Sequence, residues 1–335
     1  MKATIKDIAK TAGISYSSVS RALNGLKGVS EQTRQEIIKI AEEMEYTPNA
    51  VARGLVQKQT GTLGLILPDI TNPFYPEIAR GVEERASLAG YNTFLCNTNY
   101  DLSKEKSYLL NLLEKRVDGI ILAPVSSQSN LFENRRHMPI PFVYLGNTPE
   151  RTKYSFVLTD NVRGGYLAAR TLIEKGYRRI GFISGNDGES PVGGRFRGFQ
   201  EAMDRYNIEV NDDYVRFGDW RLQSGYEIIT RMIDTGVYPE AVVAGNDIVA
   251  MGILQGIKER HLNVPEDIAL IGFDDIPYAS WPAINLSTIR QPKSRMGKSA
   301  VEILLDRLQP ENEKDSSFTA KKIILDPELI LRGTC

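Results

Sequence analysis

Polar and aromatic side chains follow most of the short apolar segments in the larger, second part of the chain. Segments such as FVYL, GFIS, VVAG and LIGF read as buried strands, and Asn, Asp, Arg or an aromatic residue stands just after most of them. Carboxylates accept from hydroxyl groups, Arg donates to adjacent oxygens, and an aromatic ring covers the apolar face of a sugar. These residue types predict a site for a small polyhydroxylated ligand. The candidates are Asn72, Phe74, Asn147, Arg195, Trp220, Asn246 and Asp274.

The same residues do not predict catalysis. Asp274 and Asp275 are adjacent, and neighbours on a loop do not form a general acid and base by their spacing alone. Neither His137 nor His261 has a nucleophile close to it in the sequence. We therefore expect no enzyme activity, no cofactor and no metal. A structural alternative is that several of the candidates, Asn246 among them, cap helices.

A second group of candidate residues lies near the N-terminus. Residues 15–24 predict a short helix with Val19 and Ala22 inward, and its exposed face carries Tyr16, Ser17, Ser20 and Arg21. Arg can donate two hydrogen bonds to guanine, and Ser or Tyr can reach bases or phosphates. This face therefore suits the major groove of DNA.

Two further helices are predicted around that one, at residues 4–12 and 30–44, because apolar residues recur at helical spacing after Thr4 and Ser30. Gly13 separates the first two helices, which predicts a helix-turn-helix. A small helical bundle without a DNA-binding role is the alternative. Residues 1–60 carry nine Lys or Arg against six Asp or Glu, while the whole chain has a net charge of −1, so a basic head precedes an acidic body.

The head continues into a short, weak helix. Pro48 ends the third helix, and the segment AVARGLVQKQTG that follows is too short to be stable alone in water. Such a segment can fold when it docks on DNA, where Leu55 would wedge into a minor-groove base step. A plain linker is the alternative.

Beyond Gly61, apolar segments alternate with helical stretches such as 104–116 and 195–206, which predicts parallel sheets in two α/β lobes. Neither a G-x-G-x-x-G after a strand nor a G-x-x-x-x-G-K-[ST] motif occurs. No segment approaches the roughly 20 apolar residues of a membrane-spanning helix. Two cysteines, Cys96 and Cys335, cannot build a disulfide framework, so we expect a cytoplasmic protein.

The head resembles the LacI/GalR family of transcriptional regulators. The resemblance is carried by TIKDIA at 4–9, GISYSSVSRALN at 13–24, VSEQTR at 29–34 and YTPNAVARGL at 46–55. It implies a bacterial, nucleoid-associated repressor that binds operator DNA as a homodimer. The implied DNA contacts are Thr4, Ile5, Tyr16, Ser17, Ser20, Arg21, Asn24, Ser30, Thr33, Tyr46, Asn49, Ala52 and Leu55.

The resemblance also implies the domain plan. A helix-turn-helix domain spans 1–46, a hinge 47–60, and a periplasmic-binding-protein-like core 61–335, with one lobe at about 61–160 and 290–320 and the other at about 161–289 and 321–335. GGRFRGF, GND and GFDD match the effector-contacting motifs of the family, which favours Arg195, Asn246 and Asp274. Gly146 departs from the Asp that many members carry.

The implied mechanism is allosteric repression of a carbohydrate-utilisation operon. An effector between the lobes, a sugar or a sugar phosphate, changes how the hinges pair and hence the affinity for the operator. Three alternatives stay open. They are a catabolite regulator whose corepressor is a phosphorylated carrier protein, a regulator with a purine-type corepressor, and a free-standing sugar-binding protein, against which the basic head argues.

Overall fold

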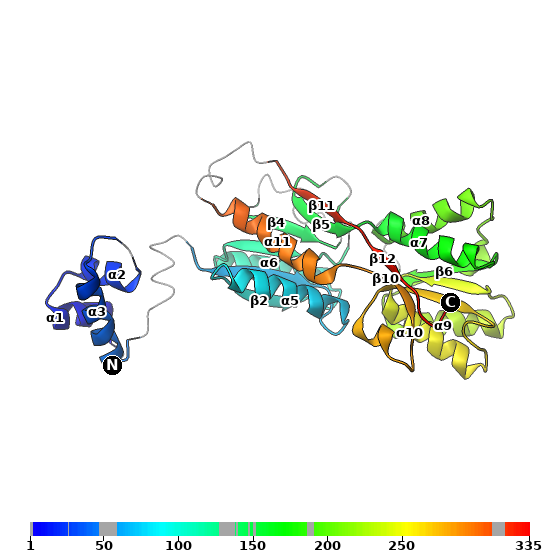
Figure 1. The fold of residues 1–335 in the computed structure, drawn as a ribbon, viewed down its shortest axis with the longest axis horizontal. Coiled ribbons are helices and arrows are strands. Elements are labelled where there is room, and N and C mark those ends of the chain that lie inside the picture. Colours follow the sequence, from blue (N-terminus) through cyan, green and yellow to red (C-terminus); the bar gives the residue numbers. More distant parts are fainter. Residues whose placement is uncertain are drawn as a thin grey trace. The chain divides into compact units, whose positions relative to one another are not determined.

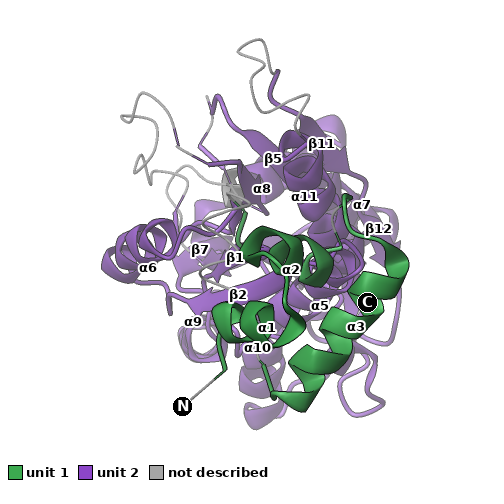
Figure 2. Cartoon of the chain, turned by 90° about the vertical axis from the view of Figure 1, so that its left-hand side faces the viewer, with its two compact units in different colours: residues 1–60 green, residues 61–335 purple. Residues whose placement is uncertain are grey.

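The structure is a computed structural model, which describes residues 3–25, 27–46, 59–126, 138, 140–146, 148–149, 152–185, 191–309 and 319–335. The chain divides into two compact units, Met1–Thr60 and Gly61–Cys335, coloured separately in Figure 2.

The described residues of the first unit form three helices, α1 (Ile5–Ala12), α2 (Tyr16–Leu23) and α3 (Glu31–Glu43). Each begins at a hydroxyl side chain that accepts a backbone N–H, and at α1 the Asp7 carboxylate also accepts from the backbone N–H of Thr4, which completes a capping box. Ile8, Val19 and Ile37 are almost fully buried between the helices. The apolar spacing in the sequence therefore produces the helices expected there.

The second unit contains two six-stranded sheets. The first has the order β11-β5-β4-β3-β1-β2, and every neighbouring pair in it is parallel. Its strands are β1 (Thr62–Leu67), β2 (Asn92–Asn97), β3 (Gly119–Leu122), β4 (Phe142–Leu145), β5 (Ser155–Thr159) and β11 (Lys322–Leu325). Helices α5 (Phe74–Ser87), α6 (Leu102–Glu114) and α11 (Lys293–Arg307) pack on it.

The second sheet has the order β12-β10-β9-β8-β6-β7, parallel except that β12 runs antiparallel to β10. Its strands are β6 (Ile180–Gly185), β7 (Val215–Gly218), β8 (Ala241–Ala244), β9 (Ala269–Asp274), β10 (Ser287–Arg290) and β12 (Glu328–Ile330). Helices α7 (Asn161–Glu174) and α8 (Pro191–Arg205) cover one face, and α9 (Leu222–Asp234) and α10 (Asp247–Glu259) cover the other (Figure 1). The described part of this unit also contains two 3-10 turns, η1 (Asp212–Tyr214) and η2 (Pro277–Ser280).

The sheets confirm the predicted fold class, a helical head plus a core of two doubly wound lobes. One detail of the predicted lobe boundaries is wrong. We expected residues 321–335 in the second lobe, but β11 pairs with β5 in the first sheet, Lys322 opposite Phe156, and only β12 joins the second. The chain therefore passes between the sheets three times: after β5, after β10 and after β11.

Buried glycines bring paired helices into backbone contact. Gly165 of α7 faces the Arg195 carbonyl of α8, and Gly198 of α8 faces the Val162 carbonyl of α7, so that a Cβ at either position would overlap an oxygen. The same contact joins α9 to α10 through Gly225 and Gly252, and α5 to α11 through Gly81 and Gly297. Each of these four glycines faces a carbonyl oxygen of the opposite helix. Close packing at these crossings fixes the relative position of the two helices in each pair.

Substitution of Gly165 by Ala tests this packing, because the close crossing reverses the sign of the expected change in stability. In an ordinary helix interior, Gly→Ala stabilises by roughly 0.5–1 kcal/mol. Here we expect a loss of about 1–3 kcal/mol, because the added methyl group overlaps the Arg195 carbonyl. Urea unfolding of the full chain measures the change, and a gain in stability would contradict the close crossing.

Candidate nucleic-acid interface and ligand pocket

One face of α2 is exposed in the described part of the head. Val19 and Ala22 are buried against the other head helices, with exposed fractions of 0% and 2%, while Tyr16 on the opposite side is 52% exposed. Ser17 and Arg21 are also exposed on that side, and Ser20 is partly exposed. The structure therefore places the four predicted DNA-contacting residues of α2 on one surface.

Several other predicted DNA contacts of the head lie at helix ends. Thr4 and Ser30 are the N-caps of α1 and α3, and the Ser30 hydroxyl lies 2.8 Å from that of Thr33. Backbone N–H groups at helix N-termini favour anions, so these positions suit phosphate oxygens. Asn24 caps the end of α2 and donates to the Ser20 carbonyl at 2.8 Å.

Two further predicted contacts are partly buried. Ile5 and Tyr46 pack against the apolar cluster of the head, so much of each side chain is used for folding. Asn49, Ala52 and Leu55 of the predicted hinge lie outside the described residues, as does Asn147 of the predicted effector site.

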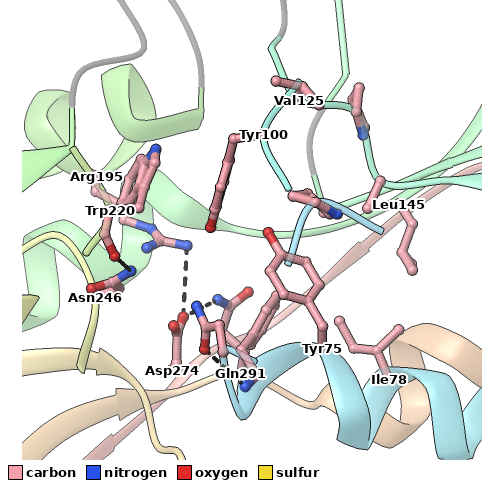
Figure 3. Close-up of a pocket in the computed structure, with 16 residues that line it drawn as sticks. Tyr75, Ile78, Tyr100, Val125, Leu145, Arg195, Trp220, Asn246, Asp274 and Gln291 are labelled. Carbon is pink, nitrogen blue, oxygen red and sulfur yellow. Dashed lines mark hydrogen bonds and ion pairs between the residues drawn. The ribbon is translucent and has the colours of Figure 1, made fainter. Parts of the chain in front are cut away.

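In the second unit, a pocket lies where the carboxyl ends of both sheets meet (Figure 3). Its empty space, including the part open to solvent, is about 720 Å³. Six of the seven predicted effector residues line it. They are Asn72, Phe74, Arg195, Trp220, Asn246 and Asp274.

Arg195 occupies the pocket from α8 and is held from several directions. Its Nε donates to Asn161 Oδ1 at 2.8 Å, one terminal nitrogen donates to the Gly245 carbonyl, and the other lies 3.9 Å from Asp274 Oδ1. The guanidinium carbon lies 3.8 Å from the centre of the Phe273 ring. Only 12% of the side chain is exposed, so the guanidinium is fixed before any ligand arrives.

Asp274 ends β9 and presents its carboxyl group to the pocket. Gln291 Nε2 donates to Asp274 Oδ1 at 2.7 Å, and Lys293 Nζ donates to the Asp274 carbonyl at 2.8 Å. Burial raises the pKa of Asp274 to about 6, although Arg195, Gln291 and Lys293 each act to lower it. The carboxyl group thus has an ionisation equilibrium close to neutral pH.

Two neighbouring carboxyl groups complete this end of the second sheet. Asp247 is fully buried, and accepts from Thr288 Oγ1 at 2.6 Å and from the Ile276 amide at 2.9 Å. Burial, together with the charge of Asp274, holds the pKa of Asp247 well above its usual range. Burial also opposes ionisation of Asp275, but hydrogen bonds from Arg290 and Arg332, both at 2.7 Å, outweigh it and lower its pKa.

Asn246 and Asn72, two further predicted pocket residues, also make hydrogen bonds within the protein. Asn246 is the N-cap of α10, where its Oδ1 accepts from the Val249 amide at 2.7 Å, so the capping alternative is confirmed for this residue. Asn72 Oδ1 accepts from the Phe74 amide at 3.0 Å at the start of α5. Because Asn246 Nδ2 donates to the Trp220 carbonyl at 3.4 Å, this residue also ties two parts of the pocket together.

The sequence-based prediction missed part of the pocket. Gln291 follows β10, a four-residue strand that the apolar pattern did not reveal, and Tyr100 follows β2, where the rule of residues after strand ends could have found it. Tyr75 and Ile78 lie next to predicted residues on α5, and Leu145 ends β4. Figure 3 shows the two tyrosines across the pocket from Trp220.

Comparison with known proteins identifies both units. Residues 4–49 match the family described as bacterial regulatory proteins, lacI family, and residues 169–335 match a periplasmic binding protein-like domain. The repressor PurR of Photobacterium profundum is 36% identical over 331 residues, which cover 98% of both chains.

Two solved structures extend the similarity to the fold. The lac repressor dimer bound to operator and the anti-inducer ONPF is 27% identical, with a TM-score of 0.87, over 100% of this chain and 99% of that one. A LacI family regulator from Enterococcus faecium with bound ribose is 32% identical, with a TM-score of 0.71, over 82% of this chain and 98% of that one.

These similarities define a DNA-binding transcriptional regulator whose core is periplasmic-binding-protein-like. The chain belongs to the lacI family of bacterial regulatory proteins, as its head motifs predicted. Its relatives are transcriptional regulators, in agreement with the expectation that it is not an enzyme. Within the described part of the chain, no helix has the length and apolar character needed to cross a membrane.

The raised pKa of Asp274 predicts a pH-dependent contribution to stability. Between about pH 4 and 6 the folded chain retains a proton that the unfolded chain has lost, so this contribution declines as the pH rises through that window. Asp274→Asn removes the effect. We expect wild-type stability, measured relative to the variant by urea unfolding, to fall by about 2 kcal/mol from pH 4.5 to 7.5. A constant difference between the two proteins would show that Asp274 titrates normally.

Proposed function

We propose that this chain is a repressor of a carbohydrate-utilisation operon, acting in the bacterial cytoplasm. A homodimer binds a pseudo-palindromic operator through two heads, and a sugar-like effector held in the pocket changes the affinity for that operator. The observation that carries this proposal is the pocket lining, in which a buried guanidinium faces a buried carboxyl group amid amides and aromatic rings.

The chemistry of the lining suits a polyhydroxylated ring. Asp274 accepts from a hydroxyl group, while Arg195 and Gln291 donate to hydroxyl oxygens. Trp220 and Phe74 offer apolar faces for the C–H groups of the ring. The ribose bound in the E. faecium relative is a ligand of this class.

A purine-type corepressor is the second candidate. It is favoured by the relative named PurR, which is 36% identical along almost the whole chain. A purine could stack on the same aromatic rings and bond to the same amides. A thermal-shift screen of ribose, glucose, galactose, their phosphates, hypoxanthine and guanine distinguishes the two, because binding raises the melting temperature. Binding of none of these compounds would contradict both candidates.

A homodimer is supported by apolar side chains at the surface of the second unit. Phe94 and Leu95, on the edge strand β2 of the first sheet, are 47% and 44% exposed. Trp281, directly after η2 and beside the second sheet, is 54% exposed. Because aromatic residues are enriched in protein interfaces, Phe94 and Trp281 are candidates for the dimer contact.

Arg21 is the residue of α2 best suited to read a base. We expect Arg21→Ala to weaken binding to the operator by about 1–3 kcal/mol, with little change on unrelated DNA, because a guanidinium–guanine pair would be lost. The operator is first selected from random duplexes with the full chain, and fluorescence anisotropy then gives the affinities.

The matched control for Arg21 is Lys39→Ala. Lys39 is also an exposed basic residue of the head, but it lies on α3 and faces Glu43 at 3.9 Å. Its loss should reduce affinity for both kinds of DNA by a small and similar factor. Equal, non-selective losses with both variants would show that Arg21 contacts phosphate and not bases.

Arg195 tests the pocket independently of the head. We expect Arg195→Ala to retain operator affinity within about twofold and to abolish the effect of the active sugar on it, because the buried donor is lost. Arg197→Ala is the control, since Arg197 lies on the same helix with 66% of its side chain exposed and pairs with Glu201. If the sugar still shifts operator binding of Arg195→Ala, the pocket is not the effector site.

A further inference from the structure

Lys293 is a buried cation at the junction of the two lobes. It is the first residue of α11, just after the connection from the second sheet to the first, and is 5% exposed. Its ammonium donates to the carbonyl oxygens of Asp274 at 2.8 Å and Asp275 at 2.6 Å, and lies 3.5 Å from Glu77 Oε1 of α5. One side chain therefore links the end of β9 to a helix of the first lobe.

The backbone that Lys293 holds is unusual. Asp274 has a φ of 120° and Asp275 a φ of 51°, both in the left-handed region that residues with a side chain seldom adopt. Such a conformation persists only where surrounding groups hold it. Two hydrogen bonds from one ammonium supply that restraint, and the same turn sets the direction of the Asp274 carboxyl group in the pocket.

We propose that Lys293 is a positioning residue of the effector pocket, which fixes the Asp274–Asp275 turn and, through Glu77, aligns it with α5. This assignment rests on the proposed effector role of the pocket. Because α5 begins at Phe74, which also lines the pocket, the Lys293 ammonium connects the pocket's two sides without lining it.

The charges around Asp274 predict how its pKa should change if Lys293 has this role. Lys293 acts to lower the pKa of Asp274. Glu77 pairs with the same ammonium and carries a negative charge, and a nearby like charge disfavours a carboxylate. Removing the lysine charge should therefore raise the pKa of Asp274, and removing the glutamate charge should lower it. The charged or polar groups facing Asp274 and Lys293 are Arg195 of α8, Asp247 of α10, Asp275 after β9, Gln291 after β10 and Glu77 of α5.

The first test measures the backbone of the full chain without a ligand. In Lys293→Met, hydrogen exchange of a peptide covering residues 272–279 should accelerate at least tenfold. Lys298→Met is the control, because Lys298 also joins α11 to α5, through Glu84 at 2.9 Å, but does not contact Asp274. Unchanged exchange in Lys293→Met, or equal acceleration in both variants, would overturn the proposal.

The second test measures the Asp274 carboxyl group directly, by carbon-13 NMR of aspartate-labelled protein with the resonance assigned through Asp274→Asn. We expect its titration midpoint to move up in Lys293→Met and down in Glu77→Gln. A general loosening of the fold would not move the midpoint in opposite directions. Should Lys293→Met not fold, the downward shift in Glu77→Gln still decides, and its absence rejects the assignment.

Both measurements are independent of the effector. A protein that binds no sugar and no purine would contradict the proposed function and leave these two results intact. Conversely, a protein that responds to ribose but shows neither change would retain its effector site and reject the role of Lys293.

Discussion

Burial of the Asp274 carboxyl group constrains the whole second unit. A carboxylate removed from water is costly unless donors and cations surround it. Here Arg195 comes from α8, Gln291 from the segment after β10, and Lys293 from the first turn of α11. These groups stand together only when both sheets and the connection between them are in place. The pocket is therefore a consequence of the complete fold and not of any single loop.

The sheet topology explains why polar and aromatic groups gather in this pocket. In open parallel sheets, side chains just beyond the carboxyl ends of the strands surround a crevice. Pro68 follows β1, Ala123 follows β3, Asn246 follows β8 and Gln291 follows β10, and all four line the pocket. Because both sheets contribute, a ligand in the pocket contacts both lobes, which is the geometry a regulator needs if binding is to change their relative position.

Much of this arrangement can be predicted from the sequence. The apolar segments predicted the buried strands: FVYL is β4, GFIS lies in β6 and LIGF lies in β9, and every residue of these three strands is buried. The strands β10, β11 and β12 have three or four residues each and no distinct pattern. Their places depend on pairing with distant partners, which local periodicity does not encode. Gln291 and the lobe assignment of residues 321–325 were missed for this reason.

The candidate site shows the same limit at the level of single residues. Residue type and position at a strand end predicted Asp274, whereas Arg195, which lies on α8, was favoured by the motif GGRFRGF and the family resemblance. Lys293 carries no such signal: a lysine at the start of a helix normally points to solvent, and its burial follows from Glu77 and the Asp274 carbonyl, which lie far away in the sequence.

The glycine contacts between helices bear on how the core can move. At α5–α11, α7–α8 and α9–α10 the backbones touch, so neither helix of a pair can slide without colliding with a carbonyl group of the other. Each lobe should therefore behave as a rigid body. Any rearrangement of the lobes is then confined to rotation about the three connections that pass between the sheets. A small change of torsion angle in these connections becomes a large displacement at the far ends of the lobes.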